Sequence, residues 1–416
     1  MLQAPGCDEY DPDNLPVAEA RRRIAQLVRP VAETETVPLR EALDRVLAAD
    51  VASPLDVPPA ANSAMDGYAL RAADLPADGE AVLEVVGTVL AGHPFAGEVG
   101  PGQAVRIMTG APLPRGADTV VMQEHARREG DRVAIGPGHR PGQHVRHAGE
   151  DIARGSTVLA AGRRLVPADL GVLASLGVAE VTVRRRPRVA FFSTGDELRP
   201  VGEPLAEGQI YDSNRYTLHG LLARLGVEVQ DLGLIPDDRA AIEDAFARAA
   251  AGADAVITSG GVSVGEADFV KETLDRLGQV NFWKIAMKPG KPLAVGRLGS
   301  ALFFGLPGNP VSVMATFYQF AQPALRALAG EAVTGPLTLR VPAAERLRKR
   351  PGRTDFQRGI LERDAGGRLV VRGTGAQGSH LLTSMSRANC FIVLPADWGD
   401  VEPGTEVEVQ PFFGLV

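Results

Sequence analysis

Residues 254–269 read DAVITSGGVSVGEADF, an apolar run that passes directly into a glycine-rich loop. The run predicts a buried strand, and the loop is typical of sites that bind phosphate. The loop also carries Glu266 and Asp268, whose charges would repel a phosphate. Mg2+ resolves this conflict, because it binds carboxylates and phosphate oxygens together. The stretch therefore predicts a strand that ends at a magnesium–phosphate site.

The composition limits the class of protein. A chain of 416 residues predicts two to four domains, and 45% hydrophobic with 23% charged residues is typical of a globular protein. The net charge of −7 argues against a nucleic-acid binder without sequence preference. The two cysteines, Cys7 and Cys390, cannot form an all-cysteine zinc site. Without a signal peptide or a long apolar run, we expect no membrane span and a cytoplasmic location.

The order of patterns along the chain predicts several domains. Residues 15–29 have the apolar spacing of an amphipathic helix, and residues 39–50 fit a shorter helix. Residues 54–145 are rich in Gly, Pro and Val and predict a β-rich insertion. From 184 to 330 apolar strands alternate with helical segments, which predicts a doubly wound, mainly parallel sheet. The alternating pattern after Gly330 predicts a small β-barrel or sandwich.

Chemically active side chains collect where the strands of the α/β region end. In such sheets ligands bind outside the carboxyl ends of the strands. There the sequence places acids, lysines and two glycine-rich helix entries; singly each fits an ordinary turn, but together they indicate an anion site with a metal. The acids that we expect to hold Mg2+ are Glu197, Asp237 and Asp268, with Asp238 and Glu266 as weaker candidates, and the lysines are Lys284, Lys288 and Lys291.

Standard catalytic motifs fit poorly. No Walker A sequence occurs, and the GxGxxG match at 373–378 lies outside any strand–helix–strand unit. Residues 261–265 match GxSxG, but a nucleophilic Ser263 should follow its strand directly, and two glycines and a valine intervene.

Two further regions carry polar turns. Near the C-terminus, either Arg353 or Arg358 could bind an oxyanion, with Ser379 and His380 close by, although a hairpin turn explains this pattern equally well. In the β-rich insertion, Asp66 and Thr109 lie in glycine-containing turns that need no function.

Eight motifs in colinear order resemble the MoeA family of molybdopterin molybdenumtransferases, to which the E domain of gephyrin is also similar. They are NSAMDGYAL, RIMTGAPLPRGAD, HAGEDI, STGDEL, GQIYDSN, SGGVSVGEADF, MKPGKPL and GLPGNPVS. The resemblance implies a four-part, elongated subunit that forms a homodimer. Its expected parts are a helix with an elongated linking domain at 15–53 and 145–183, a β-rich inserted domain at 54–144, a MogA-like α/β domain at 184–330 and a small β-barrel at 331–416.

The resemblance also implies a reaction and a set of residues. Molybdate would be inserted into the dithiolene of adenylylated molybdopterin with help from Mg2+, and AMP would be released. The family's catalytic positions fall at Asp66, Thr109, Glu197, Asp237, Asp268, Lys284, Lys288, Arg358 and Ser379. Its substrate-binding positions fall at Gly260, Gly261, Ser263, Lys288, Lys291, Pro292, Ser312, Arg358 and Ser379. The partner subunit would complete the cleft by supplying Asp66 and Thr109.

Two other functions fit the same residues. The α/β domain could itself adenylylate molybdopterin, which would consume ATP. Alternatively, the chain could be a non-catalytic scaffold whose dimer surface binds partners. The intact set of acids and lysines favours an enzyme.

Overall fold

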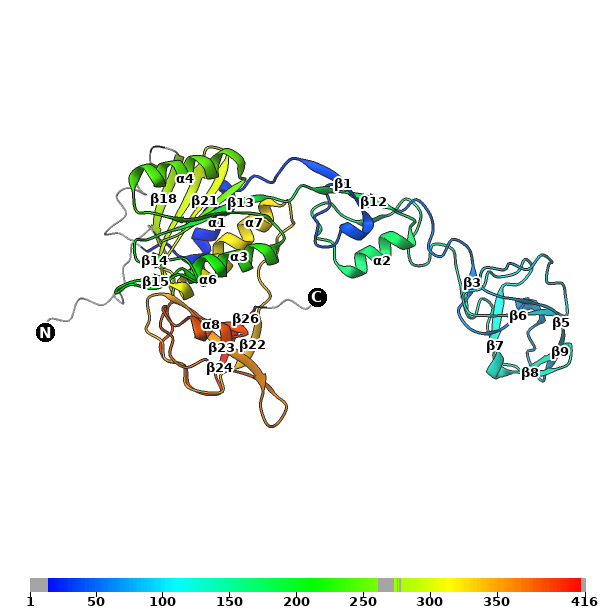
Figure 1. Cartoon of the computed structure of the whole chain (residues 1–416). Coiled ribbons are helices and arrows are strands. Elements are labelled where there is room, and N and C mark those ends of the chain that lie inside the picture. The colour runs from blue at the N-terminus through cyan, green and yellow to red at the C-terminus, as the bar shows by residue number, and fades with distance from the viewer. Residues whose placement is uncertain (1–13, 261–272, 275, 277, 413–416) are drawn as a thin grey trace.

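The computed structural model describes residues 14–412 except 261–272, 275 and 277. The chain is elongated, with an α/β body and the C-terminal sheet at one end, a slender linking region in the middle and a β body at the far end (Figure 1).

The α/β body is built on a six-stranded sheet. Its order is β16 (Glu228–Ile235), β13 (Arg188–Thr194), β17 (Ala255–Ser259), β21 (Ala301–Leu306), β20 (Pro292–Leu298) and β18 (Gly278–Lys284). Phe191 and Phe192 are adjacent in β13 and both fully buried, each in a different hydrophobic cluster. Successive side chains of a strand point to opposite faces, so this sheet is covered on both sides.

Helices cover the two faces unequally. The first cluster packs α1 (Val17–Leu27), α3 (Ser213–Leu225), α6 (Pro310–Thr316) and α7 (Gln322–Leu328) against the sheet, and the second packs α4 (Arg239–Gly252) against the other face. A π-helical turn at Phe317–Ala321 joins α6 to α7, whose second residue is Pro323. Proline cannot donate a helical hydrogen bond, and π turns accommodate such interruptions. The amphipathic helix predicted at 15–29 and the alternation of strands and helices predicted from 184 to 330 are confirmed.

The sheet departs from the predicted arrangement at one edge. Strands β16, β13, β17 and β21 are parallel, but β20 pairs antiparallel with both of its neighbours, β21 and β18. Neither β20 nor β18 is among the strands that the apolar runs of the sequence predict. Each contains a glycine, Gly278 or Gly296, at which a Cβ would collide with the backbone of the neighbouring strand. Glycine weakens a strand pattern even where close approach of two strands requires it.

The linking region differs from the sequence prediction at residues 39–50. It contains β1 (Thr34–Pro38) paired with β12 (Glu180–Arg184), β2 (Val51–Ala52) paired with β11 (Thr157–Leu159), and α2 (Pro167–Ser175). The helix predicted at 39–50 is wrong, because only a 3-10 turn at Leu39–Glu41 forms. Asp44 has a left-handed φ of 61°, and Leu47 forms a bridge to Val183. Pairing between distant segments thus overrides the local helical pattern.

The far β body is a second six-stranded sheet. Its order is β7 (Thr119–Met122), β4 (Gly67–Leu70), β6 (Gln103–Ile107), β5 (Ala81–Val89), β9 (Arg132–Ile135) and β8 (Ala126–Glu129). A short pair, β3 (Asn62–Ser63) with β10 (Val145–Arg146), and two 3-10 turns at Ala72–Asp74 and Gln123–His125 complete it. The β-rich character predicted for this region is confirmed.

The C-terminal sheet adjoins the α/β body. It contains β22 (Leu339–Pro342), β23 (Thr354–Arg363), β24 (Leu369–Gly373), β25 (Cys390–Leu394) and β26 (Glu406–Pro411). The short helix α8 (Leu382–Arg387) lies between β24 and β25 in the chain. Strand β19 (Met287–Lys288) comes from the α/β region and pairs with β23. A bridge between Ala343 and Val371 connects the end of β22 to β24. The sheet therefore curls back on itself, and β19 attaches it to the preceding domain.

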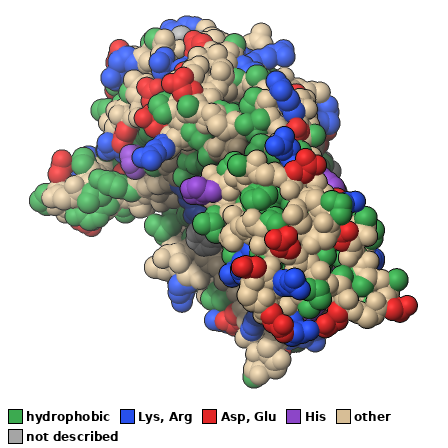
Figure 2. Space-filling view, turned by 90° about the vertical axis from the view of Figure 1, so that its right-hand side faces the viewer, with side chains coloured by type: hydrophobic (Ala, Val, Ile, Leu, Met, Phe, Trp, Pro, Cys, Tyr) green, Lys and Arg blue, Asp and Glu red, His purple; other side chains and the backbone are tan. Residues whose placement is uncertain are grey.

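The surface shows acidic and basic side chains interspersed over the face in Figure 2, without one large basic area on that face. Within the described part of the chain, no helix has both the length and the apolar character needed to cross a membrane.

Candidate functional site

The first part of the site is the edge at which the parallel strands end. Glu197 follows β13, and Asp237 follows β16. A short ribbon, β14 (Leu198–Arg199) with β15 (Ile210–Tyr211), extends from this edge. The N–H of Asp237 donates to Asp196 Oδ1 at 3.4 Å and so connects the loops after β13 and β16. The structure therefore brings two of the three predicted magnesium ligands to neighbouring loops.

Gly260 marks the point at which the glycine-rich loop begins. Its N–H donates to the carbonyl of Leu306 at 3.2 Å, which joins the ends of β17 and β21. Its φ is +91°, and an added Cβ would lie 2.6 Å from the Thr194 carbonyl oxygen. Only glycine meets both conditions without strain. The predicted residues Gly261, Ser263 and Asp268, together with Glu266, lie outside the described residues.

The donor atoms at this edge are suitable for Mg2+. Carboxylate oxygens are the protein ligands that this ion prefers. Asp212 is 2% exposed, and its Oδ2 is buried without a hydrogen-bond partner. Such an atom is costly unless a ligand, ion or water satisfies it. Among the described residues no cluster of three or more His, Cys, Asp or Glu side chains is arranged around a metal position.

The second part of the site is a cavity of about 890 Å3 between the α/β body and the C-terminal sheet. Its walls come from the loop after β19, the start of α6 and the loops around β23 and β24. The basic lining residues are Lys288, Lys291, Arg346, Arg348 and Arg353. Among the described lining residues the one acid is Glu345, whose Oε1 accepts the N–H of Gly373 at 2.9 Å. The cavity is therefore suited to an anion.

Most of the predicted substrate-binding residues meet in this cavity. Its lining includes Lys288, Lys291, Pro292, Ser312 and Ser379. The N–H of Val311 donates to the carbonyl of Ser379 at 3.0 Å, which places the serine's loop at the start of α6. The structure thus assembles side chains separated by up to 91 positions in the sequence. Lys284, by contrast, ends β18 and is not among the lining residues.

Arg358 lies behind the cavity wall. It is 1% exposed, and its guanidinium donates to Ser384 Oγ at 3.0 Å and to the Gly378 carbonyl at 3.1 Å. Burial lowers the pKa of Arg358 to about 10, so the side chain remains a cation at neutral pH. Arg353, the alternative that the sequence left open, lines the cavity itself.

Asp355 places a buried carboxyl group beside these cations. It is 6% exposed, and its backbone pairs with that of Lys288 where β23 meets β19. Gln357 Nε2 donates to Asp355 Oδ2 at 2.9 Å. Burial raises the pKa of the Asp355 carboxyl, and Gln357, Lys288, Lys349 and Arg358 oppose that rise. Sequence reasoning missed Asp355, because nothing in the local pattern marks a strand acid as buried.

Asp66 and Thr109 form a separate polar site in the far β body. Asp66 Oδ1 accepts both the N–H and the hydroxyl of Thr109 at 2.7 Å each. These bonds lower the pKa of Asp66, which is therefore ionised at neutral pH. Within one chain the linking region separates this pair from the α/β body (Figure 1). The structure does not bring the pair together with the other predicted residues.

Comparison with known proteins identifies the family. Three family models match in order: the MoeA N-terminal region (domain I and II) at 15–177, a probable molybdopterin binding domain at 190–327 and the MoeA C-terminal region (domain IV) at 340–412. A molybdopterin molybdenumtransferase of Haemophilus influenzae is 48% identical over 97% of this chain and 100% of the relative. The chain belongs to the MoeA family.

Other MoeA relatives agree with this assignment. A molybdopterin molybdenumtransferase of Nostoc is 40% identical over 91% of this chain and 88% of the relative. The crystal structure of a molybdopterin biosynthesis moeA protein from Pyrococcus horikoshii is 31% identical, with a TM-score of 0.84 over 96% of this chain and all of that chain. The predicted family membership is confirmed, and the curated relatives are named as enzymes.

Asn214 is a polar residue of this MoeA chain that was not predicted from the sequence as a site residue. Its Nδ2 donates to Ser259 Oγ at 2.9 Å and to the carbonyl of Gly308 at 2.7 Å. The first turn of α3 is thereby attached to the ends of β17 and β21. Asp212 caps the same helix by accepting the N–H of Arg215 at 3.1 Å. The signal was present, since a DSN sequence before an apolar helix is typical of a capped helix start.

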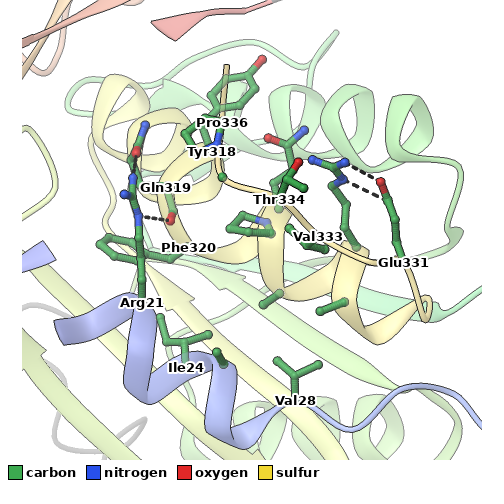
Figure 3. Close-up of a pocket in the computed structure, with 17 residues that line it drawn as sticks. Arg21, Ile24, Val28, Tyr318, Gln319, Phe320, Glu331, Val333, Thr334 and Pro336 are labelled. Carbon is green, nitrogen blue, oxygen red and sulfur yellow. Dashed lines mark hydrogen bonds and ion pairs between the residues drawn. The ribbon is translucent and has the colours of Figure 1, made fainter. Parts of the chain in front are cut away.

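A second cavity, of about 470 Å3, lies away from all the predicted residues. Figure 3 shows it between α1, α7 and the segment that contains Val333 and Pro336. Arg21 reaches from α1 to the side chain and carbonyl of Gln319. The walls of this cavity are largely apolar, and its two arginines, Arg21 and Arg326, are bonded to Gln319 and Glu331. The cavity is therefore less suited to an oxyanion than the first one.

Proposed function

We propose that this MoeA family member inserts molybdate into adenylylated molybdopterin and releases AMP, with Mg2+ as the metal. The observation that carries the proposal is the cationic cavity at the junction of the α/β body and the C-terminal sheet. It unites Lys288, Lys291, Ser312 and Ser379, which come from two domains. The names of the relatives support the proposal, since they are molybdopterin molybdenumtransferases.

The cavity offers what a tetrahedral dianion such as molybdate needs. Lysine ammonium groups supply positive charge, and serine hydroxyls supply donors that can rotate toward an oxyanion. Burying a dianion is unfavourable unless cations and hydrogen-bond donors surround it. Five basic residues and one described acid line the cavity, and one of the basic residues, Arg346, is paired with Asp400 and Glu402. The lining thus still carries more positive than negative charge.

The strand edge would bind the phosphate end of the pterin substrate. Gly260 begins a loop whose backbone N–H groups can bind phosphate, and Glu197, Asp237 and Asp268 would hold Mg2+. When bound, Mg2+ would neutralise the pyrophosphate and stabilise the charge that develops on the departing AMP phosphate. Water adds to one phosphorus, the bond between the two phosphates breaks, and AMP leaves. Asn214 would hold the loops around β17 and β21 in register during this step.

A homodimer would add Asp66 and Thr109 to the cleft of the partner subunit. The pair is well ordered by its two hydrogen bonds but lies at the far end of its own chain. Residues on an elongated arm can contribute to a site on a two-fold related copy. The proposal therefore assigns the pair to the site of the other protomer.

The test is to incubate the purified protein with adenylylated molybdopterin, Mg2+ and molybdate. We expect release of AMP and formation of a cofactor that activates a molybdenum-dependent apoenzyme. A parallel reaction contains ATP and molybdopterin that is not adenylylated. Consumption of ATP in that reaction, with no AMP release in the first, would support adenylylation instead. Absence of both activities would leave the scaffold function.

A further inference from the structure

The loop Gly375–Leu381 forms one wall of the cationic cavity and has little stiffness of its own. It contributes Gly375, Ala376, Gln377, Gly378, Ser379 and His380 to the lining. Gly375 has a φ of +95°, a conformation that glycine adopts without strain. A glycine-containing loop loses much conformational entropy when it is ordered. Specific contacts must therefore hold Ser379 in place.

Gln377 makes the largest share of these contacts. Its Oε1 accepts the N–H of Arg358 at 2.9 Å. Its Nε2 donates to the carbonyl of Arg358 at 3.1 Å and to the carbonyl of Gly375 at 3.3 Å. One amide side chain thus binds both backbone groups of a single strand residue and the loop's own backbone. An amide is the side chain that can accept on one atom and donate twice on the other.

The side chain of Arg358 also binds the loop. Its guanidinium donates to the carbonyl of Gly378, one residue beyond Gln377, and to Ser384 Oγ. Ser384 Oγ in turn donates to the carbonyl of Leu381 at 2.6 Å. Among the described residues no carboxylate lies within ion-pair distance of Arg358. Its buried charge therefore acts on the loop backbone and on any anion beyond it, while Asp355 interacts with it over a longer distance.

The loop is also connected across the domain boundary. The carbonyl of Ser379 accepts the N–H of Val311, which is adjacent to the cavity residue Ser312. A displacement of Gln377 would thus be transmitted to two serines that face the cavity, one from each domain.

We propose that Gln377 is a positioning residue that sets the affinity of the cavity for its oxyanion substrate. It acts by holding Arg358 and the Ser379 loop in the arrangement that presents hydroxyl and backbone donors to the anion. The inference rests on the proposed function of the cavity and extends it to a residue outside the family positions predicted from the sequence.

The test replaces Gln377 by methionine, which has similar length and no hydrogen-bonding amide. We expect Gln377→Met to raise the dissociation constant for molybdate roughly tenfold, which is about 1.4 kcal/mol, because the variant loses the three hydrogen bonds of the amide. Titration calorimetry without pterin measures this constant. The KM for molybdate should rise similarly, the KM for adenylylated molybdopterin should stay within about twofold, and saturating molybdate should restore kcat.

Gln103→Met is the matched control. Gln103 also stabilises a turn, because its Oε1 accepts the N–H of Gly100 at 3.0 Å, but it lies in the far β body. Ser384→Ala is a second test variant, which removes the guanidinium contact and the hydrogen bond from Ser384 Oγ to the Leu381 carbonyl but leaves the contacts of Gln377 in place. It should also raise the dissociation constant for molybdate, by a smaller factor. Thermal unfolding measures whether each variant is folded.

Two results would overturn the inference, one that concerns Gln377 and one that concerns the cavity itself. If Gln377→Met binds molybdate as well as the wild type does, Gln377 does not position the site, whatever the result for Ser384→Ala. If the wild type itself fails to bind molybdate, the proposed function of the cavity fails and this inference fails with it.

Discussion

Asp66 and Thr109 are 43 positions apart, and the Asp66 carboxylate accepts two hydrogen bonds from Thr109, one from its N–H and one from its hydroxyl. Thr109 is exposed and Asp66 is half-buried, and neither residue belongs to a hydrophobic core cluster of this domain. Such an ordered carboxylate outside the core is better explained by function than by stability.

Asp66→Asn should therefore abolish molybdate-dependent AMP release while leaving the fold intact. The substitution removes the charge but keeps the side chain's size. Thr109→Val should have a smaller effect, because the backbone N–H still donates to Asp66 after the hydroxyl is lost. AMP release measures activity, and circular dichroism measures the fold. An active Asp66→Asn variant would contradict the assignment of Asp66.

Mixing inactive variants tests whether Asp66 acts in the partner's site. A dimer of one Asp66→Asn chain and one Lys288→Met chain contains one site with both wild-type residues and one with neither. Random assembly of equal amounts should therefore restore about a quarter of the wild-type activity. The separate variants and a mixture prepared without subunit exchange serve as controls. Failure to regain activity despite proven exchange would place Asp66 in its own chain's site or outside the reaction.

Glu331 should matter for stability rather than for catalysis. Its Oε2 accepts from Arg164 at 3.1 Å and from Arg326 at 3.0 Å, which joins the linking region to α7. Glu331→Gln should lower the free energy of unfolding by about 1.5–3 kcal/mol, because a buried charged partner is lost. Urea unfolding measures this, with the exposed Asp244→Asn as control. Equal urea midpoints for Glu331→Gln and Asp244→Asn would refute the prediction.

Asp355 gives a prediction about pH. Its pKa is raised in the folded protein, so the unfolded chain loses this proton first as the pH rises. The contribution of Asp355 to stability should thus fall between the unfolded pKa of about 3.9 and the higher folded pKa, and stay constant above it. Subtracting the urea midpoint of Asp355→Asn from that of the wild type at each pH isolates this contribution. A difference that rises with pH would contradict the assignment.

The sequence predicted the α/β body well, because its evidence was local. The apolar run of β13 is buried on both faces, and Phe191 and Phe192 lie in separate clusters as such a strand requires. The order of strand ends then placed Glu197 and Asp237 at one edge. Local patterns and tertiary structure agree in this region.

The remaining features depend on contacts between distant segments. Strand β20 contains Gly296, which is unfavourable in a strand unless a neighbour must approach closely. Residues 39–50 do not form the predicted helix, because Leu47 pairs with Val183. The sequence also left Arg353 and Arg358 as alternatives. The structure shows that Arg353 lines the cavity, whereas Arg358 lies behind its wall and binds the Ser379 loop.

The central claim is that this chain couples AMP release to molybdate insertion, and a single-turnover experiment tests it directly. Excess protein is mixed with adenylylated molybdopterin and Mg2+, with or without molybdate, and AMP and pterin-bound molybdenum are measured in the same samples. We predict that AMP and bound molybdenum appear together in equal amounts, and that omitting molybdate or replacing Lys288 by Met suppresses both, whereas Arg248→Ala, an exposed control, suppresses neither. AMP release that proceeds without molybdate, or molybdate-dependent AMP release that leaves no molybdenum on the pterin, would contradict it.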